Sequence, residues 1–402
     1  MSVSIEFGYC TNVHAGTTLA AAKANLMQYS APIRKQICPD SKLPLGLWLS
    51  ETVAAELTSP SSREQFREWL DDNNFAAYTF NGFPQRDFHQ DVVKHEVYKP
   101  TWLDSERMEY TKLLADILAD LIDGPIGTIS TVPLGWPSPA WNASEFEAAA
   151  ANLLSVAVYL AELHERTGKE IVLAIEPEPG CVLNTAPEIA DFFKNHLMNG
   201  SSEDVARRYL SVCHDVCHSG VMFEGQTHAL ELYRAHGIRV GKVQISSAVH
   251  VPWNQVEDDT ENQQAMLDQL RGFTEPKYLH QTTRSTQDGK LAELHEDLPG
   301  ALKTWLDDLP NSPWRVHFHV PIFVSSFGQL ETTQGDISEA VAYLEKHRDF
   351  NSADCNWFTG HYEVETYAWP VLPPDLAADD LASGISEELG YFARMLDAKR
   401  SD

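Results

Sequence analysis

Short apolar runs alternate with longer amphipathic stretches along most of the chain. The apolar runs have the length and composition of strands and lie at 4–9, 45–49, 75–80, 127–132, 171–175, 210–212 and 240–245. Stretches such as 105–122 and 144–167 have apolar residues at helical spacing, and Gly168 follows the second as a stop signal. Strands that alternate with helices form parallel βαβ units. The pattern therefore predicts an α/β protein.

The alternation becomes irregular beyond residue 250. Further strands are predicted at 278–283, 314–323 and 358–369, which gives nine or ten candidates in all. A (β/α)8 barrel uses eight strands, so the surplus predicts a rim insertion at 250–312, near strands 7 and 8. An open doubly wound sheet is the alternative, but it usually has a glycine-rich turn after its first strand, which Gly8 and Gly16 do not make. We expect a single (β/α)8 TIM barrel domain over 1–402, with an acidic C-terminal segment at 374–402.

The balance of charge limits the classes of partner. Acidic residues number 58 against 30 lysines and arginines, which gives a formal net charge of −28. Such a surface repels nucleic acid phosphates and anionic lipids. The charge therefore argues against nucleic acid binding and leaves a small-molecule metabolite as the expected partner.

The cysteines and the N-terminus bear on the compartment. The six cysteines show no CxxC spacing, so reduced thiols fit better than disulfides. Cys213 and Cys217 flank Asp215 and are alternative soft ligands for zinc. The N-terminus lacks a basic region followed by an apolar run, and no apolar stretch approaches the length of a membrane span. We therefore expect a cytoplasmic protein that does not insert into membranes.

Acidic and histidine side chains gather at four of the apolar runs. The four pairs are Glu176 with Glu178, Asp215 with His218, His317 with His319, and Glu363 with Glu365. The chemistry of a barrel lies at the carboxyl ends of its strands, and residues two apart on a strand share a face. Mixed oxygen and nitrogen donors suit Mn, Mg, Co or Zn, and flanking acids can move protons. These clusters predict a divalent cation site at the barrel mouth.

Seven motifs together support a resemblance to a known family. They are 8–16 (GYCTNVHAG), 79–84 (TFNGFP), 129–135 (ISTVPLG), 174–180 (AIEPEPG), 242–248 (KVQISSA), 317–321 (HFHVP) and 363–367 (EVETY). In these motifs the chain resembles the EboE-type metabolite traffic proteins of the xylose-isomerase-like TIM-barrel superfamily. The resemblance implies a TIM barrel with a divalent metal site. It also implies a functional link to a membrane prenyltransferase system of the UbiA type.

The wider superfamily implies which residues form the site. Its members have a Glu on strand five, an Asp on strand six with a His three residues later, a His on strand seven and an acid on strand eight. Glu176, Asp215, His218 and Glu365 match this pattern. Strand seven instead has Gln244, so that His319 or His317 would have to fill the place of its histidine, with His280 as a further candidate.

The expected roles follow from charge balance. Three carboxylates brought together without a cation would repel one another, and at least one would take up a proton. We expect the metal ligands to be Glu176, Asp215, His319 and Glu365, with Glu176 and Glu365 also in the proton-transfer roles. We expect the substrate to contact His218, His317, Gln244, Glu178, Asn12, His14, Asn81 and Trp136. The alternative is a set of hydrogen-bonded pairs in a metal-free pocket.

Three functions are compatible with such a site. The first is a metal-dependent isomerase or epimerase that acts on a small polyhydroxylated or secondary metabolite. The second is a non-catalytic carrier or scaffold that binds a metabolite in the barrel pocket. The third is a metal-dependent hydrolase. A complete metal shell with open positions favours catalysis, and a broken shell favours binding.

Overall fold

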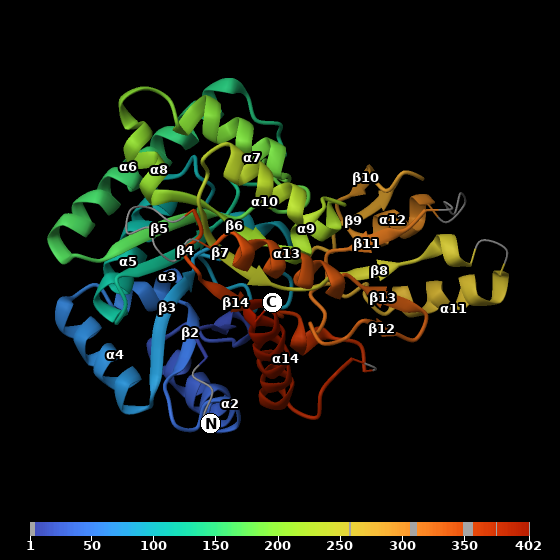
Figure 1. Ribbon diagram of the computed structural model, residues 1–402, viewed down its shortest axis with the longest axis horizontal. Coiled ribbons are helices and arrows are strands. Elements are labelled where there is room, and N and C mark those ends of the chain that lie inside the picture. Colours follow the sequence, from blue (N-terminus) through green and yellow to red (C-terminus); the bar gives the residue numbers. More distant parts are fainter. Residues whose placement is uncertain (1–4, 257–258, 306–311, 349–356, 375, 402) are drawn as a thin grey trace.

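Eight parallel strands close into a barrel, with helices around its outside (Figure 1). The computed structural model describes residues 5–256, 259–305, 312–348, 357–374 and 376–401. In the order in which they pair around the barrel, the strands are β1 (Gly8–Cys10), β14 (Tyr362–Val364), β7 (Val240–Ile245), β6 (Leu210–Asp215), β5 (Glu170–Ile175), β4 (Ile126–Thr131), β3 (Phe75–Asn81) and β2 (Leu43–Trp48). The predicted (β/α)8 barrel is therefore confirmed.

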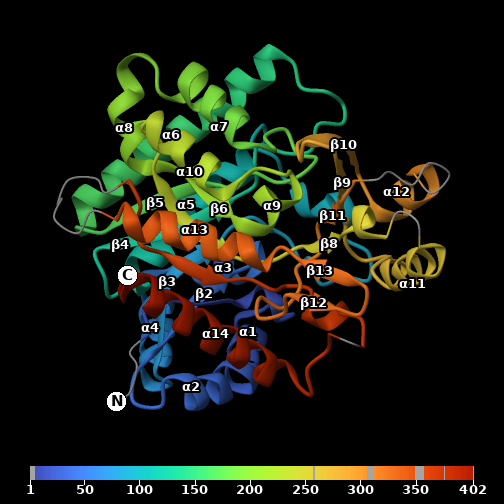
Figure 2. The ribbon, with the colours of Figure 1, turned by 45° about the vertical axis from the view of Figure 1, so that its right-hand side comes forward.

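Helices connect the strands and cover the barrel. They are α1 (Leu19–Asn25), α2 (Ala31–Ile37), α3 (Glu51–Glu56), α4 (Pro60–Asp72), α5 (Ser105–Leu121), α6 (Ala143–Thr167), α7 (Ala186–Phe192), α8 (Glu203–Tyr209), α9 (Val216–Val221), α10 (Gln226–Ala235), α13 (Gln334–Lys346) and α14 (Leu381–Ser401). The C-terminal helix α14 lies against α2, so the last described helix packs on the N-terminal part of the barrel (Figure 2).

The helix α6 shows how local sequence sets an element's ends. At its start, the Asn142 side chain accepts hydrogen bonds from N–H groups of the first turn, and the Glu145 side chain accepts one from the Asn142 N–H. At its end, Gly168 has the left-handed backbone conformation, with φ 70°. By length and composition alone α6 could cross a membrane, contrary to the expectation from sequence. In the fold its residues Leu153 and Leu160 are buried against the barrel core. One such helix, packed in this way, is typical of a globular protein's core.

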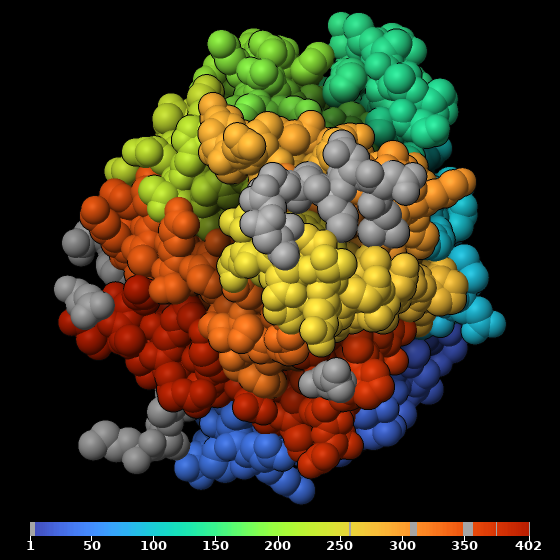
Figure 3. Space-filling model, turned by 90° about the vertical axis from the view of Figure 1, so that its right-hand side faces the viewer, coloured from blue at the N-terminus to red at the C-terminus, as the bar shows by residue number. Residues whose placement is uncertain are grey.

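A second sheet lies beside the barrel, to the right in Figure 1. Its six antiparallel strands run in the order β10 (Leu291–His295), β9 (Thr282–Ser285), β11 (Trp314–Val316), β8 (Val249–Val251), β13 (Leu330–Thr332) and β12 (Ser326–Phe327). With α11 (Thr260–Arg271) and α12 (Leu298–Trp305) it encloses an apolar cluster of its own, which includes Trp253, Trp305 and Trp314. We call residues 249–332 the rim segment. Seen from that side, the rim segment, in yellow and orange, covers the middle of the molecule (Figure 3).

Two sequence-based strand assignments differ from the structure. The run 314–323 was expected to be one long strand, but only Trp314–Val316 pairs, and it joins the rim sheet. The strands of the second sheet therefore extend past the expected 250–312 range, to Thr332. The first barrel strand begins at Gly8 rather than at residue 4, and Ser4 and Cys355 lie outside the described residues. An apolar run cannot by itself distinguish a barrel strand from a strand of a second sheet, which explains the first difference.

The barrel interior contains a buried ion pair. Lys242 of β7 and Glu363 of β14 are both 0% exposed, and their charged atoms are 2.6 Å apart. Lys242 also donates a hydrogen bond to the Phe80 carbonyl of β3, on the opposite wall. Glu363 fits because β2 has a glycine beside it: a Cβ on Gly46 would lie 1.2 Å from a Glu363 carboxylate oxygen. The ion pair thus fills the layer of the barrel below its carboxyl-end mouth.

Candidate metal and substrate site

Three carboxylates meet at the carboxyl ends of the barrel strands. Asp215 ends β6, while Glu176 and Glu365 directly follow β5 and β14. The Glu176 N–H donates to the Thr131 carbonyl and the Glu365 N–H to the Ile245 carbonyl, so both backbones are still held by neighbouring strands. One carboxylate oxygen from each of the three acids lies within 4.8 Å of the other two. The three acids are therefore placed by rigid parts of the fold.

Asp215 has one satisfied and one unsatisfied oxygen. Its Oδ1 accepts hydrogen bonds from the His218 N–H and the Ser246 hydroxyl, both at 2.8 Å. Its Oδ2 is buried without a hydrogen-bond partner. Although burial raises the pKa of Asp215, His218 and His319 lower it, and the net pKa lies below the usual value. Asp215 thus presents a fixed, ionised oxygen to the space between the acids and the histidines.

The other two acids are harder to ionise. Burial raises the pKa of Glu176 to about 7, and its Oε2 has no hydrogen-bond partner. Burial and the neighbouring Glu176 and Asp215 raise the pKa of Glu365 well above its usual value. The Asn12 and Asn81 amides, at 2.6 and 2.9 Å, both donate to Glu365 Oε1 and fix its orientation. Without a cation, this cluster would therefore hold at least one extra proton near neutral pH.

His319 comes from the rim segment rather than from a barrel strand. The segment after β11 folds back over the barrel, and the Val320 N–H donates to the Ser247 carbonyl just beyond β7. His319 Nδ1 donates to the Glu365 carbonyl at 2.8 Å, which leaves Nε2 with a free lone pair. That Nε2 lies 3.9 Å from Asp215 Oδ2. His319 therefore lies beside the end of β7, a strand that itself has Gln244 and no histidine.

His218 and His317 form an imidazole pair next to this cluster. His218 Nδ1 donates to the Pro177 carbonyl and His317 Nδ1 to Gln281 Oε1, both at 2.8 Å. Their Nε2 atoms therefore face each other, 3.1 Å apart. Burial lowers the pKa of His317 well below its usual value, while nearby acids outweigh burial and raise the pKa of His218. Of the two rings, His218 is therefore the one that binds a proton more readily.

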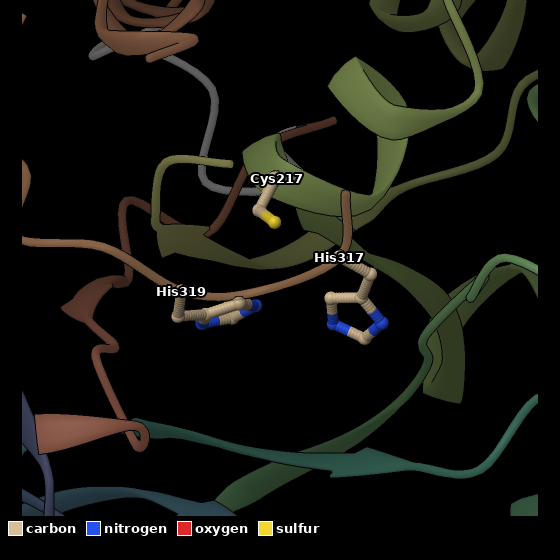
Figure 4. A group of neighbouring side chains, drawn as sticks. All are labelled: Cys217, His317 and His319. Atoms are coloured by element: carbon tan, nitrogen blue, oxygen red, sulfur yellow. The ribbon is translucent and has the colours of Figure 1, made fainter. Parts of the chain in front are cut away.

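Cys217 lies behind the two rim histidines. Figure 4 shows His317 and His319 on one segment, with the Cys217 thiol coming from a separate helix, α9. One ligand atom of each of these three side chains lies within 4.8 Å of the other two. Burial raises the pKa of Cys217 well above its usual value, so that the thiol stays protonated. A neutral thiol is a poor metal ligand, and the oxygen and imidazole donors are the better candidates.

A cavity of about 80 Å³, which opens to solvent, lies over this cluster. Its polar floor contains Glu176, Glu178, His218, His317, His319, Glu365, Asn12 and Asn81. Glu178 accepts hydrogen bonds from the Tyr98 hydroxyl and the Gln281 amide, at 2.7 and 3.1 Å. Gln281 also holds His317, so that one network links a barrel strand, a loop and the rim segment.

Four of the expected residues lie elsewhere. His14 is bonded to the Tyr9 hydroxyl and stacked on Tyr29. Trp136 stacks on the far side of Tyr98 and lines a neighbouring cavity. Both ring nitrogens of His280 are engaged, one by Glu275 and one by the His317 carbonyl. Gln244 lies in the barrel interior on the face of Lys242, and neither of its amide atoms has a hydrogen-bond partner.

Sequence reasoning missed several residues that shape the cavity. They are Tyr98, Gln281, Ser246, Phe83, Phe88, Lys94, Tyr278, Leu279 and Tyr367. The long loop at 85–104 was a signal for the members between 88 and 98, because a loop of that length in a compact domain usually binds something. Ser246 directly follows a candidate strand, and Tyr367 lies within another. Nothing in the sequence indicates that the segment around Tyr278 returns to the barrel mouth.

A buried acid on α14 holds two site segments in place. Glu388 accepts hydrogen bonds from the Thr366 hydroxyl and the Trp369 indole, just after Glu365. It also accepts one from the Ile322 N–H, just after His319. Burial raises the pKa of Glu388 to about 7. The last helix is therefore tied to both halves of the ligand cluster.

This raised pKa predicts a pH dependence of stability. The folded protein holds a proton on Glu388 that the unfolded chain releases between about pH 4.5 and 7. Its contribution to the free energy of unfolding should fall by up to about 3 kcal/mol as the pH rises through that window. Urea denaturation at pH 5 and pH 8 should show a smaller difference for Glu388→Gln than for the wild type. An unchanged difference would contradict the assignment, and the exposed neighbour, as Glu387→Gln, is the matched control.

Comparisons with known proteins bear on the fold. No protein-family model matches the chain. No curated protein matches it either. A xylose isomerase-like TIM barrel protein from Mycobacterium smegmatis, solved in complex with magnesium, aligns over 98% of this chain and 97% of its own, at 11% identity and a TM-score of 0.52. A xylose isomerase domain protein from Alicyclobacillus acidocaldarius aligns over 99% of this chain and 100% of its own, at 10% identity and a TM-score of 0.47. At these identities only the fold is shared. The chain has the xylose isomerase-like TIM-barrel fold.

Proposed function

We propose that this protein is a metal-dependent isomerase or epimerase that moves a proton beside a carbonyl group of a small metabolite. The observation that carries the proposal is the set of unsatisfied ligand atoms: Glu176 Oε2, Asp215 Oδ2 and His319 Nε2. They belong to two groups whose ligand atoms lie within 4.8 Å of one another and which share Asp215. Buried polar atoms without partners are rare, and several that converge indicate a ligand.

The residues fit one divalent cation. Ligand atoms bound to one ion at about 2.1 Å lie about 3 to 4.2 Å apart, which agrees with the 3.9 Å between Asp215 and His319. Glu176, Asp215, His319 and Glu365 would hold the ion. Three of them are already oriented by hydrogen bonds to their other atoms: Asp215 through Oδ1, His319 through Nδ1 and Glu365 through two asparagines. A magnesium complex of the Mycobacterium smegmatis protein with this fold adds support.

The reaction class follows from the donors around the cavity. A bound divalent cation supplies Lewis acidity to a carbonyl and hydroxyl pair of the substrate. Glu176 and Glu365 can take and return the proton on the hydroxyl-bearing carbon next to the carbonyl. His218 and Glu178 lie on the cavity floor and can orient the remaining substrate oxygens. The acidic floor disfavours anionic substrates.

Two further candidates remain from the sequence. A carrier would use the same pocket without chemistry, and the resemblance to EboE-type metabolite traffic proteins is what suggests it. A metal-dependent hydrolase would use the same ligands to activate water. Burial raises the pKa of Glu176 to about 7, which favours a role in proton transfer over simple binding.

Two measurements test the proposal. Metal analysis of the purified protein is expected to give one divalent cation per chain, and a metal-free protein that takes up no Mn²⁺ would contradict it. The Mn²⁺ protein, incubated in D₂O with D-fructose or 2-hydroxyacetophenone, is expected to exchange the hydrogen next to the carbonyl, followed by NMR. EDTA or Glu176→Gln should abolish the exchange. Ligand binding without any exchange would instead support the carrier.

A further inference from the structure

Part of the lining of the cavity is aromatic. Trp48, Phe88, Val93 and Tyr278 form an apolar cluster of their own, separate from the barrel core. Phe88 lies between Trp48 and Tyr278, with ring centroids 5.1 and 6.2 Å away. Phe88 and Tyr278 both line the cavity. We call Phe83, Phe88, Tyr278, Leu279 and Tyr367, which all line it, the apolar wall.

Two parts of the chain build this wall together. Phe88 belongs to the loop between β3 and α5, and Tyr278 belongs to the rim segment. Backbone hydrogen bonds from the Val93 and Lys94 N–H groups to the Lys277 carbonyl, at 2.8 and 3.0 Å, join the two parts. The wall is thus held in place by main-chain bonds and is part of the folded architecture.

The wall begins directly beside the candidate metal ligands. The ring of Tyr367 lies 4.7 Å from that of His319 and 5.2 Å from that of Tyr278, measured between centroids. A molecule held by its oxygen atoms at Asp215 and His319 would therefore extend over Tyr367 toward Phe88. The cavity has one polar end and one aromatic end.

Apart from the hydroxyls of Tyr278 and Tyr367, the polar side chains that line the cavity outside the acids and histidines are largely engaged. The Asn81 amide is used by Glu365 and Cys10, and its carbonyl by the Phe83 N–H. Lys94 is paired with Asp297 at 2.5 Å. Among the described residues, the lining atoms that are buried without a partner are Asn12 Oδ1, Glu176 Oε2 and His319 Nε2, all on the floor. A free hexose would bring several hydroxyls against the wall, each losing hydrogen bonds to water.

We infer that the substrate is an amphiphilic molecule: adjacent carbonyl and hydroxyl oxygens at one end, and an aromatic ring at the other that binds the apolar wall. This inference rests on the proposed function, because the cation would hold the oxygen end. It names a substrate class that differs from unsubstituted sugars. Aromatic rings favour edge-to-face contacts with one another. The ring pairs around Phe88 and Tyr278 are edge-to-face or tilted, so they suit a further aromatic ring.

The test compares two chelators that differ only at the apolar end. Acetohydroxamate and benzohydroxamate present the same pair of oxygens, with a methyl group or a phenyl ring attached. Isothermal titration of the Mn²⁺-loaded protein is expected to show benzohydroxamate binding at least about tenfold more tightly, because a ring buries more apolar surface than a methyl group. Phe88→Ala should remove most of that preference. Phe327→Ala, which truncates a phenylalanine in the edge strand β12 of the rim sheet, is the matched control and should keep it.

The outcomes separate this inference from the proposed function. Equal affinities for the two hydroxamates, or no binding of either by a protein that does hold Mn²⁺, would overturn the substrate class and leave the metal site intact. A protein that binds no Mn²⁺ would overturn both. A preference that survives Phe88→Ala would show that the ring does not bind this wall. Thermal unfolding checks that the Phe88→Ala variant folds, and Tyr278→Ala replaces it if it does not. The ratio of the two hydroxamate affinities in the wild type can overturn the inference without any variant.

Discussion

Replacing Asp215 with Asn is expected to weaken Mn²⁺ binding by at least about 100-fold. Asp215 belongs to both the carboxylate group and the histidine group of ligand atoms. The carboxamide removes a negative charge from a site where His218 and His319 keep Asp215 ionised. It can still accept one hydrogen bond from the His218 N–H or from Ser246, so the local backbone should remain in place. Titration calorimetry on the metal-free protein measures the loss.

The matched control is Asp116→Asn. Asp116 lies on the outside of the barrel on α5, where it accepts a hydrogen bond from Tyr159. Its replacement should leave the Mn²⁺ affinity unchanged. Stoichiometric binding retained by Asp215→Asn at wild-type affinity would contradict the ligand assignment. EDTA should also lower the melting temperature of the wild type but not that of Asp215→Asn, since a ligand stabilises only the state that binds it.

The barrel could be predicted from sequence because its signal is repeated and local. The runs that became β5 and β7 are buried at every position, as expected for strands covered on both faces. Glu176, Asp215 and Glu365 follow such runs, and the topology alone brings the ends of parallel strands together. These three were predictable for the same reason as the fold.

The histidines were harder to place, because their position depends on a long-range return of the chain. His317 and His319 were expected on a barrel strand, but β11 pairs with β8 and β9 of the rim sheet. The strand eight that closes the barrel is β14. The apolar wall was also not predictable, since Phe88 and Tyr278 meet only through hydrogen bonds between two loops. The spacing of apolar residues predicts the structure of one segment. It does not predict which loops contact one another.

Replacing Lys242 with Met should destabilise the protein by about 3 to 5 kcal/mol. Both members of the Lys242–Glu363 pair are fully buried, so the substitution leaves an uncompensated carboxylate in the barrel interior. That carboxylate lies against Gly46 of β2 and is fully buried. Equilibrium denaturation in urea measures the change in the free energy of unfolding.

A double substitution and a surface pair provide the controls. Lys242→Met combined with Glu363→Gln should be less destabilising than the single change, because no buried charge is left alone. Lys42→Met breaks an exposed pair with Asp71 and Asp123 and should cost no more than about 1 kcal/mol. If Lys242→Met cost as little as Lys42→Met, the interior carboxylate would have to be neutral in the folded protein.

The position of β14 has a consequence for the order in which the molecule assembles. Its partners are β7 and β1, so the barrel wall stays open between these two strands until Tyr362–Val364 are inserted. During synthesis the ribosome must make the whole rim segment and α13 before that strand emerges. From the synthesis of β7 until β14 emerges, the growing chain therefore carries unpaired edges on β1 and β7, a state exposed to aggregation. Glu365 arrives with the closing strand, and α14, which bears Glu388, follows it. Closure of the barrel and completion of the ligand cluster are one event, so a nascent chain released early would have neither.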